Sequence, residues 1–347
     1  MESLAIKYRP KTFDDVVGQD CVKAILSQQL KRKEIQHAYL FCGGAGTGKT
    51  TCARIFASEI NDGSGNPIEM DAASQNGVDD VREIIQQAKT KPLDSEYKVF
   101  IIDECHAFSN NAWQAMLKII EEPPVKSIFI FCTTDPQKIP KTIISRVQRY
   151  DFQRISQDGI VDRLKLILDL ENVESFDYTY DWDSLEYIAK IADGGMRDAI
   201  TLLDKCLAYT PELTTENVVK ALGTVDYDIM FSLTSALGRV DNLKMIEVIE
   251  TIHSNGKDLK QFIKLYIQFI LDISKYYLNC EWRYIQIPRL AEYEKKLEWF
   301  KDFDIDWFMS LLSMLIKLNA DIKYSSTAKF DIESALLVFM YESEEHE

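Results

Sequence analysis

The segment "GGAGTGKT" (43–50) constrains the fold of this chain more than any other feature. It fits the pattern G-x-x-x-x-G-K-[ST], a phosphate-binding loop that joins a strand to a helix. The apolar run Ala38–Cys42 precedes the loop, and a helical stretch, Thr50–Ile60, follows it. The loop therefore predicts the beginning of an α/β sheet whose strands run parallel.

Short, continuously apolar runs recur through the first half of the chain, as is typical of parallel strands covered on both faces. The expected strands are Ala38–Cys42, Pro67–Asp71, Lys98–Asp103, Ser127–Thr134 and Arg149–Phe152, and the expected helices between them are Thr50–Ile60, Val78–Lys89 and Ala112–Glu121. This alternation predicts a parallel sheet with helices on both faces.

From about Ser156 the strands are expected to stop, because the apolar residues recur with a helical period. The stretch Phe262–Leu278 is apolar on most of its circumference and is expected to be buried among other helices. We predict an ATPase-type α/β domain at 1–155, a small helical domain at 156–223, a second helical domain at 224–341 and a disordered acidic tail at 342–347.

Composition excludes several classes of protein. A length of 347 residues implies more than one domain, and 46% apolar with 27% charged residues is typical of a soluble globular protein. The seven cysteines include no Cys-x-x-Cys pair, so free thiols in a reducing cytoplasm are expected. No apolar run reaches the ~18 residues of a membrane span. A net charge of −15 argues against a broad basic surface, although a confined nucleic-acid surface stays possible.

The phosphate-binding loop predicts a nucleotide triphosphate site. Glycines let backbone N–H groups close around phosphate oxygens, while Lys49 reaches the β- and γ-phosphates and the Thr50 hydroxyl ligates Mg²⁺. The expected nucleotide contacts of this region are Gly43, Gly44, Ala45, Gly46, Thr47, Gly48, Lys49, Thr50 and Thr51.

The segment "VFIIDECH" supplies a second part of such a site. Its strand delivers Asp103 and Glu104 to the carboxyl end of the sheet, where ligands bind in such folds. We expect Asp103 to hold Mg²⁺ with Thr50, and Glu104 to polarise the attacking water. His106 is expected to pack or to orient a neighbour, because no second His or Cys stands at metal-binding spacing.

Two further polar positions are candidates for phosphate contacts. The next strand ends in "CTTDPQK", where Thr133, or failing that Thr134, would bond the γ-phosphate or the water; a simple turn is the alternative. Arg197 stands in the first turn of a helix after two glycines, where a cation opposes the helix dipole. A bound phosphate, or the adjacent Asp198, would explain a cation at this unfavourable position.

Six motifs occur in an order that resembles the gamma/tau subunits of bacterial DNA polymerase III, the ATPases of the sliding-clamp loader. They are "KYRPKTFDDVVGQ", "GGAGTGKT", "IIDECHAFS", "LKIIEEPP", "TTDPQKIPKTIISR" and "DGGMRDAI". The resemblance spans Leu4 to about Thr210 and continues more weakly to the end. Replication factor C small subunits share the scheme, but "EEPP" and "TTDPQKIP" favour the bacterial branch.

The resemblance implies an AAA+ fold with an ATPase domain, a helical lid and a helical collar that assembles subunits into a ring, expected to be pentameric. It also implies ATP and Mg²⁺ as cofactors, with a sliding clamp and primer-template DNA as partners, and no polymerase activity in the chain itself. Tyr8, Arg9, Pro10 and Val17 would then border the base and ribose. Thr133 resembles the first sensor of the family and Arg197 its second.

The same resemblance gives a role to Arg146 in "TIISRVQRY", which would reach the γ-phosphate of the neighbouring subunit. A surface arginine without a role is the alternative. The family's four-cysteine zinc module is expected to be absent, because "NDGSGNP" occupies that gap. The family's Ser-Arg-Cys reads Ser145-Arg146-Val147, and we expect the chain to lack the long extension of the tau form.

DNA contact is expected at two helix openings, "SQNGVDD" (74–80) and "FSNNAW" (108–113), through backbone amides and the side chains of Ser74, Asn76, Ser109 and Asn110. Ordinary helix capping is the alternative for these residues. Lys138, Lys141 and Arg149 add local positive charge.

Three function classes compete. The first is a hydrolysing clamp-loader motor, and the second is a replication factor C-like or non-hydrolysing scaffold subunit. The third is a helicase, since "DECH" is similar to the Asp-Glu-x-His box of that group. The all-helical second half argues against a helicase, which should carry a second RecA-like sheet.

Overall fold

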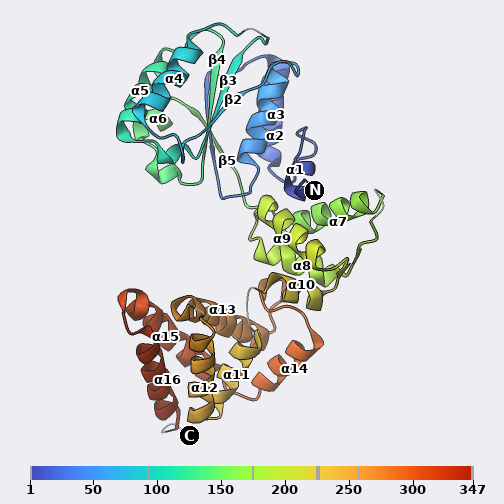
Figure 1. Ribbon diagram of the computed structural model, residues 1–347, viewed down its shortest axis with the longest axis vertical. Helices are drawn as coiled ribbons and strands as arrows, with labels where there is room; N and C mark the ends of the chain where they lie inside the picture. The colour runs from blue at the N-terminus through green and yellow to red at the C-terminus, as the bar shows by residue number, and fades with distance from the viewer. Residues whose placement is uncertain (1, 93, 174–175, 224–226, 257, 345–347) are drawn as a thin grey trace. The chain divides into compact units, whose positions relative to one another are not determined.

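The computed structural model describes residues 2–344 except for 93, 174–175, 224–226 and 257 (Figure 1). The chain packs as two compact units. Unit 1 comprises Met1–Tyr178 and Ile188–Ala208, and unit 2 comprises Thr179–Tyr187 and the chain from Tyr209 onward. Helix α8, Trp182–Ile191, contributes residues to both units.

Unit 1 contains a five-stranded parallel sheet of order β2-β3-β4-β1-β5. The strands are β1 Ala38–Cys42, β2 Ile68–Asp71, β3 Lys98–Asp103, β4 Ser127–Thr133 and β5 Gln148–Asp151. Every residue of β1 and β4 is buried, which explains why these strands read as uninterrupted apolar runs. All five strands predicted from the sequence are therefore present, and no strand end differs from its expected position by more than one residue.

Helices cover both faces of this sheet (Figure 1). One face packs against α4 and α5, and the other packs against α2 and α3. Alternate residues of β3 divide between the two cores: Phe100 and Ile102 face α4 and α5, whereas Val99 and Ile101 face α2 and α3. The helices of this unit are α1 Leu4–Lys7, α2 Asp20–Arg32, α3 Lys49–Ile60, α4 Val78–Ala88, α5 Asn110–Glu121, α6 Lys141–Ile144, α7 Gln157–Val173 and most of α9 Met196–Tyr209, with the 3₁₀ turns η1 Cys105–Ala107 and η2 Pro136–Lys138.

Unit 2 is built mainly from helices around one apolar core. Its long central helix, α13, packs against α14, α15 and α16 and buries Phe262, Tyr266 and Phe269. Leu271 on the same helix is 36% exposed, so α13 keeps one side open to solvent. The other helices are α10 Thr215–Leu222, α11 Tyr227–Gly238, α12 Asn242–Ser254, α13 Leu259–Tyr277, α14 Ala291–Phe300, α15 Ile305–Asp321 and α16 Ala328–Glu344, with the 3₁₀ turns η3 Trp282–Tyr284 and η4 Ile322–Tyr324.

The prediction that strands stop after Ser156 was wrong in one detail. Strands β6, Thr179–Tyr180, and β7, Glu212–Leu213, pair in parallel within unit 2. Two residues per strand are too few to produce a recognisable alternation of apolar and polar positions.

The domain boundaries drawn from the sequence remain a prediction. The packing division assigns 179–187 and 209–223 to unit 2, whereas the sequence pattern grouped 156–223 as one domain. Helix α16 runs to Glu344, into the segment 342–347 that was expected to be a disordered tail, and 345–347 lie outside the described residues.

All seven cysteines are free thiols. Five of them are buried, and burial raises the pKa of the Cys42 thiol to about 11. No helix within the described residues is long and apolar enough to cross a membrane. In the same part of the chain, no group of three or more His, Cys, Asp or Glu side chains is arranged to hold a metal ion, and the absence of zinc stays a prediction.

Candidate nucleotide site

A cavity of about 480 Å³ in unit 1 brings together segments that are far apart in the sequence. It is lined by the N-terminal segment, the phosphate-binding loop, the end of β3, and parts of α7 and α9. The predicted site residues that line it are Tyr8, Arg9, Pro10, Val17, Ala45, Gly46, Thr47, Gly48, Lys49, Thr50, Thr51, Asp103, Glu104 and Arg197. Gly43 and Gly44 form the entry to the loop.

Close backbone packing explains two of the loop glycines. A Cβ atom on Gly43 would lie 2.6 Å from the carbonyl oxygen of Phe152, at the end of the neighbouring strand. Gly46 has a φ of +67°, and a Cβ atom there would lie 3.0 Å from the Cα of Gly195. Any side chain at either position would push the loop away from its supports.

Lys49 is the first residue of α3 and only 6% exposed. Its Nζ donates to the carbonyl oxygens of Gly43, at 2.9 Å, and Gly44, at 2.7 Å. The hydroxyl of Thr47 also donates to the Gly44 carbonyl, at 2.9 Å. The buried ammonium is thus satisfied by the loop itself, beside the positive end of a helix, which is an arrangement suited to anions.

Two oxygen atoms that suit Mg²⁺ meet at the carboxyl end of β3. The Thr50 hydroxyl donates to Asp103 Oδ2 at 2.7 Å, and Asp103 Oδ1 accepts from the backbone N–H of Glu104 at 3.0 Å. Hydroxyl and carboxylate oxygens are the ligands that Mg²⁺ prefers. The residues expected to hold the ion are therefore adjacent, and they come from α3 and β3.

The carboxylate of Glu104 is held in place by the end of the next strand. Its Oε2 accepts from the hydroxyl of Thr134 at 2.8 Å and from the backbone N–H of Thr134 at 3.2 Å. His106 Nδ1 lies 3.2 Å from the same oxygen. Glu104 itself has a φ of +45°, in the left-handed region that is uncommon for residues with a side chain and is found mostly at functional sites.

The two threonines at the end of β4 have different partners. Thr133 is completely buried, and its hydroxyl lies 3.2 Å from His106 Nδ1 and accepts from the N–H of Asp135 at 3.0 Å. Thr134 makes the direct contact with Glu104. The sequence favoured Thr133 as the phosphate contact, and that role remains a prediction. His106 links Thr133 to Glu104, which agrees with the orienting role expected of it.

Gln19 is a site residue that sequence reasoning missed. Its amide nitrogen donates to the carbonyls of Gln153, at 2.7 Å, and Thr47, at 3.3 Å, and its amide oxygen accepts from the N–H of Gln153 at 3.0 Å. Gln19 is 8% exposed, with a φ of +58°. Gln19 is the last residue of the motif "KYRPKTFDDVVGQ", but the motif does not identify its distant partners.

Helix α9 joins the phosphate-binding loop through its first turn. The backbone N–H of Met196 donates to the carbonyl of Gly46 at 3.0 Å. Arg197, the next residue, lines the cavity. The backbone contact therefore brings Arg197 to the loop, although its role toward phosphate stays a prediction.

Arg146 lies outside the group of described residues that line the cavity. Its Nε pairs with Glu121 Oε1 at 2.8 Å, and its Nη1 donates to the Thr142 carbonyl at 2.8 Å and to Ser145 Oγ at 3.1 Å. The side chain is 40% exposed. Arg146 is thus held at the C-terminal end of α5, away from the nucleotide cavity of its own subunit.

The residues proposed for DNA contact lie at two adjacent helix openings. The backbone N–H of Ser109 donates to the Asn76 carbonyl at 3.2 Å, and Ser109 Oγ caps α5 by accepting from Ala112 at 3.2 Å. Ser74 Oγ donates to the Asp71 carbonyl at 3.1 Å. The first two bonds fit the capping alternative for Ser109, whereas Ser74 bonds within the turn before α4, whose N-cap is Gly77. DNA contact remains a prediction for Ser74, Asn76, Ser109 and Asn110.

Nearby positive charges are partly compensated. Lys138 pairs with Asp135 at 3.1 Å, and Arg149 pairs with Asp151 at 2.7 Å. Both pairs are on the surface, where such interactions are weak and easily exchanged.

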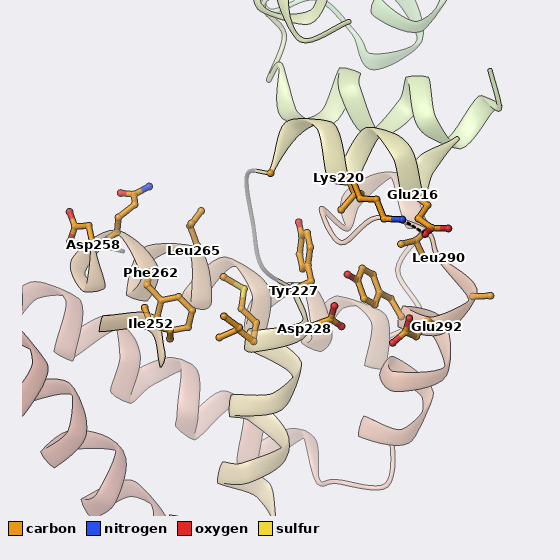
Figure 2. Close-up of a pocket in the computed structure, with 17 residues that line it drawn as sticks. Glu216, Lys220, Tyr227, Asp228, Ile252, Asp258, Phe262, Leu265, Leu290 and Glu292 are labelled. Atoms are coloured by element: carbon orange, nitrogen blue, oxygen red, sulfur yellow. Dashed lines mark hydrogen bonds and ion pairs between the residues drawn. The ribbon is translucent and has the colours of Figure 1, made fainter. Parts of the chain in front are cut away.

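A larger cavity, of about 970 Å³, lies in unit 2 between α10, α11, α13 and the beginning of α14 (Figure 2). Its charged lining residues are Lys220 and the carboxylates Glu216, Asp228, Asp258 and Glu292, and Lys220 pairs with Glu216 at 2.6 Å. An excess of negative charge opposes a nucleotide triphosphate. The cavity of about 480 Å³ in unit 1, which contains the phosphate-binding loop, is therefore the candidate nucleotide site.

Known proteins resemble the chain over nearly its whole length. Residues 67–156 match the family described as "DNA polymerase III, delta subunit", and 159–212 match "DNA polymerase III clamp loader subunit, ATPase lid domain". The chain is 31% identical to the DNA polymerase III subunit gamma of Buchnera aphidicola over 96% of this chain and 97% of that protein. It belongs to the DNA polymerase III gamma/tau family.

Other gamma/tau relatives are longer. The chain is 40% identical to the subunit tau of Bacillus subtilis over 78% of this chain and 51% of that one, and 34% identical to the subunit tau of Escherichia coli over 73% and 42%. It therefore spans about half the length or less of these two gamma/tau proteins.

A solved structure supports the fold. The RuvB Holliday junction branch migration motor of Thermotoga maritima aligns with a TM-score of 0.53 and 21% identity over 72% of this chain and 86% of that one. At that identity the likeness concerns the fold alone. With the matched ATPase lid, it identifies the AAA+ ATPase fold predicted for this gamma/tau chain.

Proposed function

We propose that this chain is an ATP-hydrolysing motor subunit of a sliding-clamp loader. The observation that carries the proposal is the convergence of Lys49, the Thr50–Asp103 pair and Glu104 at one cavity. Membership of the gamma/tau family supplies the biological context, because relatives carry names within DNA polymerase III and the matched lid belongs to a clamp loader subunit.

Binding begins with an exchange of partners at Lys49. Its ammonium bonds to the carbonyls of Gly43 and Gly44, and phosphate oxygens entering the loop would replace them. A bond between two charged groups is stronger than one between an ammonium and a neutral carbonyl. The loop N–H groups and the positive end of α3 act in the same direction.

Thr50 and Asp103 are the residues that would hold Mg²⁺, a cofactor that the fold implies. The fit rests on their hydroxyl and carboxylate oxygens, which are already 2.7 Å apart. When bound, the ion neutralises phosphate charge and orients the phosphates.

Glu104 is the proposed general base. Its Oε2 is occupied by Thr134, so we assign the attacking water to Oε1. Arg197 would stabilise negative charge from the α9 side of the cavity. Thr133 would sense the phosphate through His106, which lies between it and Glu104.

Arg146 is the proposed arginine finger, acting on the ATP of a neighbouring subunit. Its half-exposed side chain, held outside the cavity of its own subunit, fits a role across an interface. A guanidinium supplied in this way contributes on the order of 10³-fold or more to phosphoryl-transfer rates. The chain would therefore work only in a ring with other loader subunits, expected to be pentameric.

In this function, ATP binding assembles the ring around a sliding clamp and primer-template DNA, and hydrolysis releases both. The test is the ATPase rate of the purified assembly with and without clamp and primed DNA. We expect stimulation by the two together. Equal rates with and without them would contradict the loader function.

The finger is tested by mixing two variants. Arg146→Ala assemblies should bind ATP yet lose the stimulated rate. Adding Lys49→Ala subunits should restore part of it, because an intact cavity of one variant then meets an intact arginine of the other. Full stimulated activity in a homogeneous Arg146→Ala assembly would rule out the finger.

The competing functions have less support. A non-hydrolysing scaffold subunit has no need of both Lys49 and Glu104. A replication factor C-like subunit would use the same site, but the curated relatives reported above are bacterial. A helicase should carry a second RecA-like sheet, whereas the described residues form one five-stranded sheet and one two-stranded pair.

A further inference from the structure

Helix α7 contacts both the backbone and the side chain of one residue of the N-terminal segment, Tyr8. The carbonyl oxygen of Tyr8 accepts from Arg163 Nη2 at 2.8 Å, and its phenolic hydroxyl donates to Glu171 Oε1 at 2.7 Å. Arg163 and Glu171 are two steps of four residues apart on α7, so they lie along one ridge of the helix. The helix therefore fixes both the backbone and the side chain of Tyr8.

Glu171, which binds the Tyr8 hydroxyl, is a buried and charged side chain. Glu171 is 4% exposed, and its Oε1 also accepts from Lys7 Nζ at 2.8 Å. Burial by itself would raise the pKa of Glu171, but hydrogen bonds from Lys7 and Tyr8 outweigh it and hold the pKa below its usual value. A buried carboxylate with two such donors strongly disfavours separation of α7 from the N-terminal segment.

The second residue of α7 that binds Tyr8, Arg163, lies at the nucleotide cavity. Arg163 lines the cavity together with Tyr8, and burial lowers the pKa of its guanidinium while Asp15, also in the lining, raises it. None of the motifs singled out in the sequence includes Arg163 or Glu171. The wall of the cavity formed by the N-terminal segment thus depends on a helix that contributes nothing to the phosphate-binding loop.

We propose that Arg163 and Glu171 are positioning residues for the nucleotide base, which they control by holding Tyr8 on α7. Base recognition is then coupled to the docking of α7 onto the N-terminal segment, while phosphate recognition is not. The inference rests on the proposed function in requiring that the cavity binds ATP with its base beside Tyr8, a residue of the cavity lining. It does not depend on the clamp or on the ring.

The coupling has a measurable signature, because the base and the phosphates can be tested separately. ATP and inorganic tripolyphosphate, each with Mg²⁺, are titrated against the purified full-length chain. Tyr8→Phe removes only the hydroxyl that Glu171 binds, and Glu171→Gln removes the charge while keeping the shape. Each should weaken ATP binding by about 10- to 100-fold, as expected for a lost hydrogen bond to a charged group. Tripolyphosphate binding should stay within twofold of wild type.

The double variant distinguishes a joint action from two separate ones. If Tyr8 and Glu171 act through their mutual bond, the combined variant should bind ATP about as weakly as the weaker single variant. Multiplicative losses of ATP affinity would contradict the proposal.

Arg163→Lys keeps a cation but loses the planar guanidinium, and it should also weaken ATP binding without changing tripolyphosphate affinity. Tyr209→Phe and Glu83→Gln, at exposed positions, are the matched controls.

The remaining outcomes are decisive as well. Unchanged ATP affinity in all of the variants at Tyr8, Arg163 and Glu171 would overturn the proposal. A parallel loss of ATP and tripolyphosphate binding would also overturn it, because it would indicate general damage to the fold. If the wild-type chain binds neither ligand, the nucleotide site itself is wrong, and that result is distinct from a defect confined to the base.

Discussion

The two ends of the nucleotide cavity are built in different ways. At the phosphate end, Lys49 bonds to carbonyls that lie five and six residues away in the same loop. At the end formed by the N-terminal segment, where the base is expected and which we call the base end, Tyr8 bonds to Glu171 across 163 positions of the chain. The phosphate end is therefore organised by local backbone geometry, and the base end by side chains that tertiary packing brings together.

This difference has consequences for binding. A loop that is shaped by its own glycines and by the sheet beside it is organised before a ligand arrives, so little free energy is spent on ordering it. The base end, in our proposal, keeps its form only while α7 stays docked through its bonds to Tyr8. We expect chemistry and phosphate affinity to depend on the first end, and base affinity on the second.

The largest effect is expected from Glu104→Gln at the phosphate end. The amide cannot accept a proton from water, so kcat should fall by about 10²- to 10⁴-fold. ATP affinity should change only a few-fold, since Glu104 bonds to Thr134 rather than to the loop. Single-turnover hydrolysis and equilibrium binding check the two parts, with the exposed Glu34→Gln as control. An unchanged kcat would remove Glu104 from the mechanism.

Lys49→Ala should weaken ATP binding by about 100-fold or more, because the charge that phosphate requires is lost. Tripolyphosphate binding should be lost with it, which is the opposite of the pattern expected for Tyr8→Phe. Thermal unfolding should still be cooperative, since the side chain contacts only the loop in the described bonds. Lys31→Ala, on the exposed face of α2, is the control. Affinity within a few-fold of wild type would contradict the phosphate-loop assignment.

Gln19→Ala tests the side-chain contact that joins Gln19 to the phosphate-binding loop and to Gln153. The substitution leaves the Thr47 carbonyl and both backbone groups of Gln153 without their amide partner. The free energy of unfolding should drop by about 1–3 kcal/mol, the usual cost of unsatisfied buried polar groups. Urea unfolding measures it against Gln75→Ala, an exposed position. A decrease in the free energy of unfolding no larger than that of the control would show that the Gln19 side chain does not stabilise the fold.

The smallest effect is expected from Thr134→Val, which removes one hydroxyl bond to Glu104 and keeps the backbone bond. The value of kcat should fall by about 3- to 10-fold, as for one ordinary hydrogen bond, with ATP affinity unchanged. Thr133→Val is the informative partner, since Thr133 contacts His106 instead. A larger loss from Thr133→Val would favour the role that the sequence assigned to Thr133.

The sequence predicted most of the sheet, and most of the loop residues that it singled out do line the candidate cavity, although their contacts with phosphate stay a prediction. Strands β1 and β3 have the expected bounds because their apolar runs reflect burial on both faces, which is a local property. The loop chemistry was also readable, since the spacing of Gly43, Gly48 and Lys49 is itself the requirement for wrapping a phosphate. The short strands β6 and β7 were missed because two residues carry no periodic pattern.

Only the tertiary structure decided which side chains support these motifs. The choice of Thr134 over Thr133 as the partner of Glu104 depends on how the end of β4 turns. The roles of Gln19, Arg163 and Glu171 depend on contacts across 134, 155 and 163 positions. A motif is readable when its chemistry needs residues at a fixed spacing along the chain. A supporting contact needs only proximity in space, and the chain reaches that proximity when its helices pack.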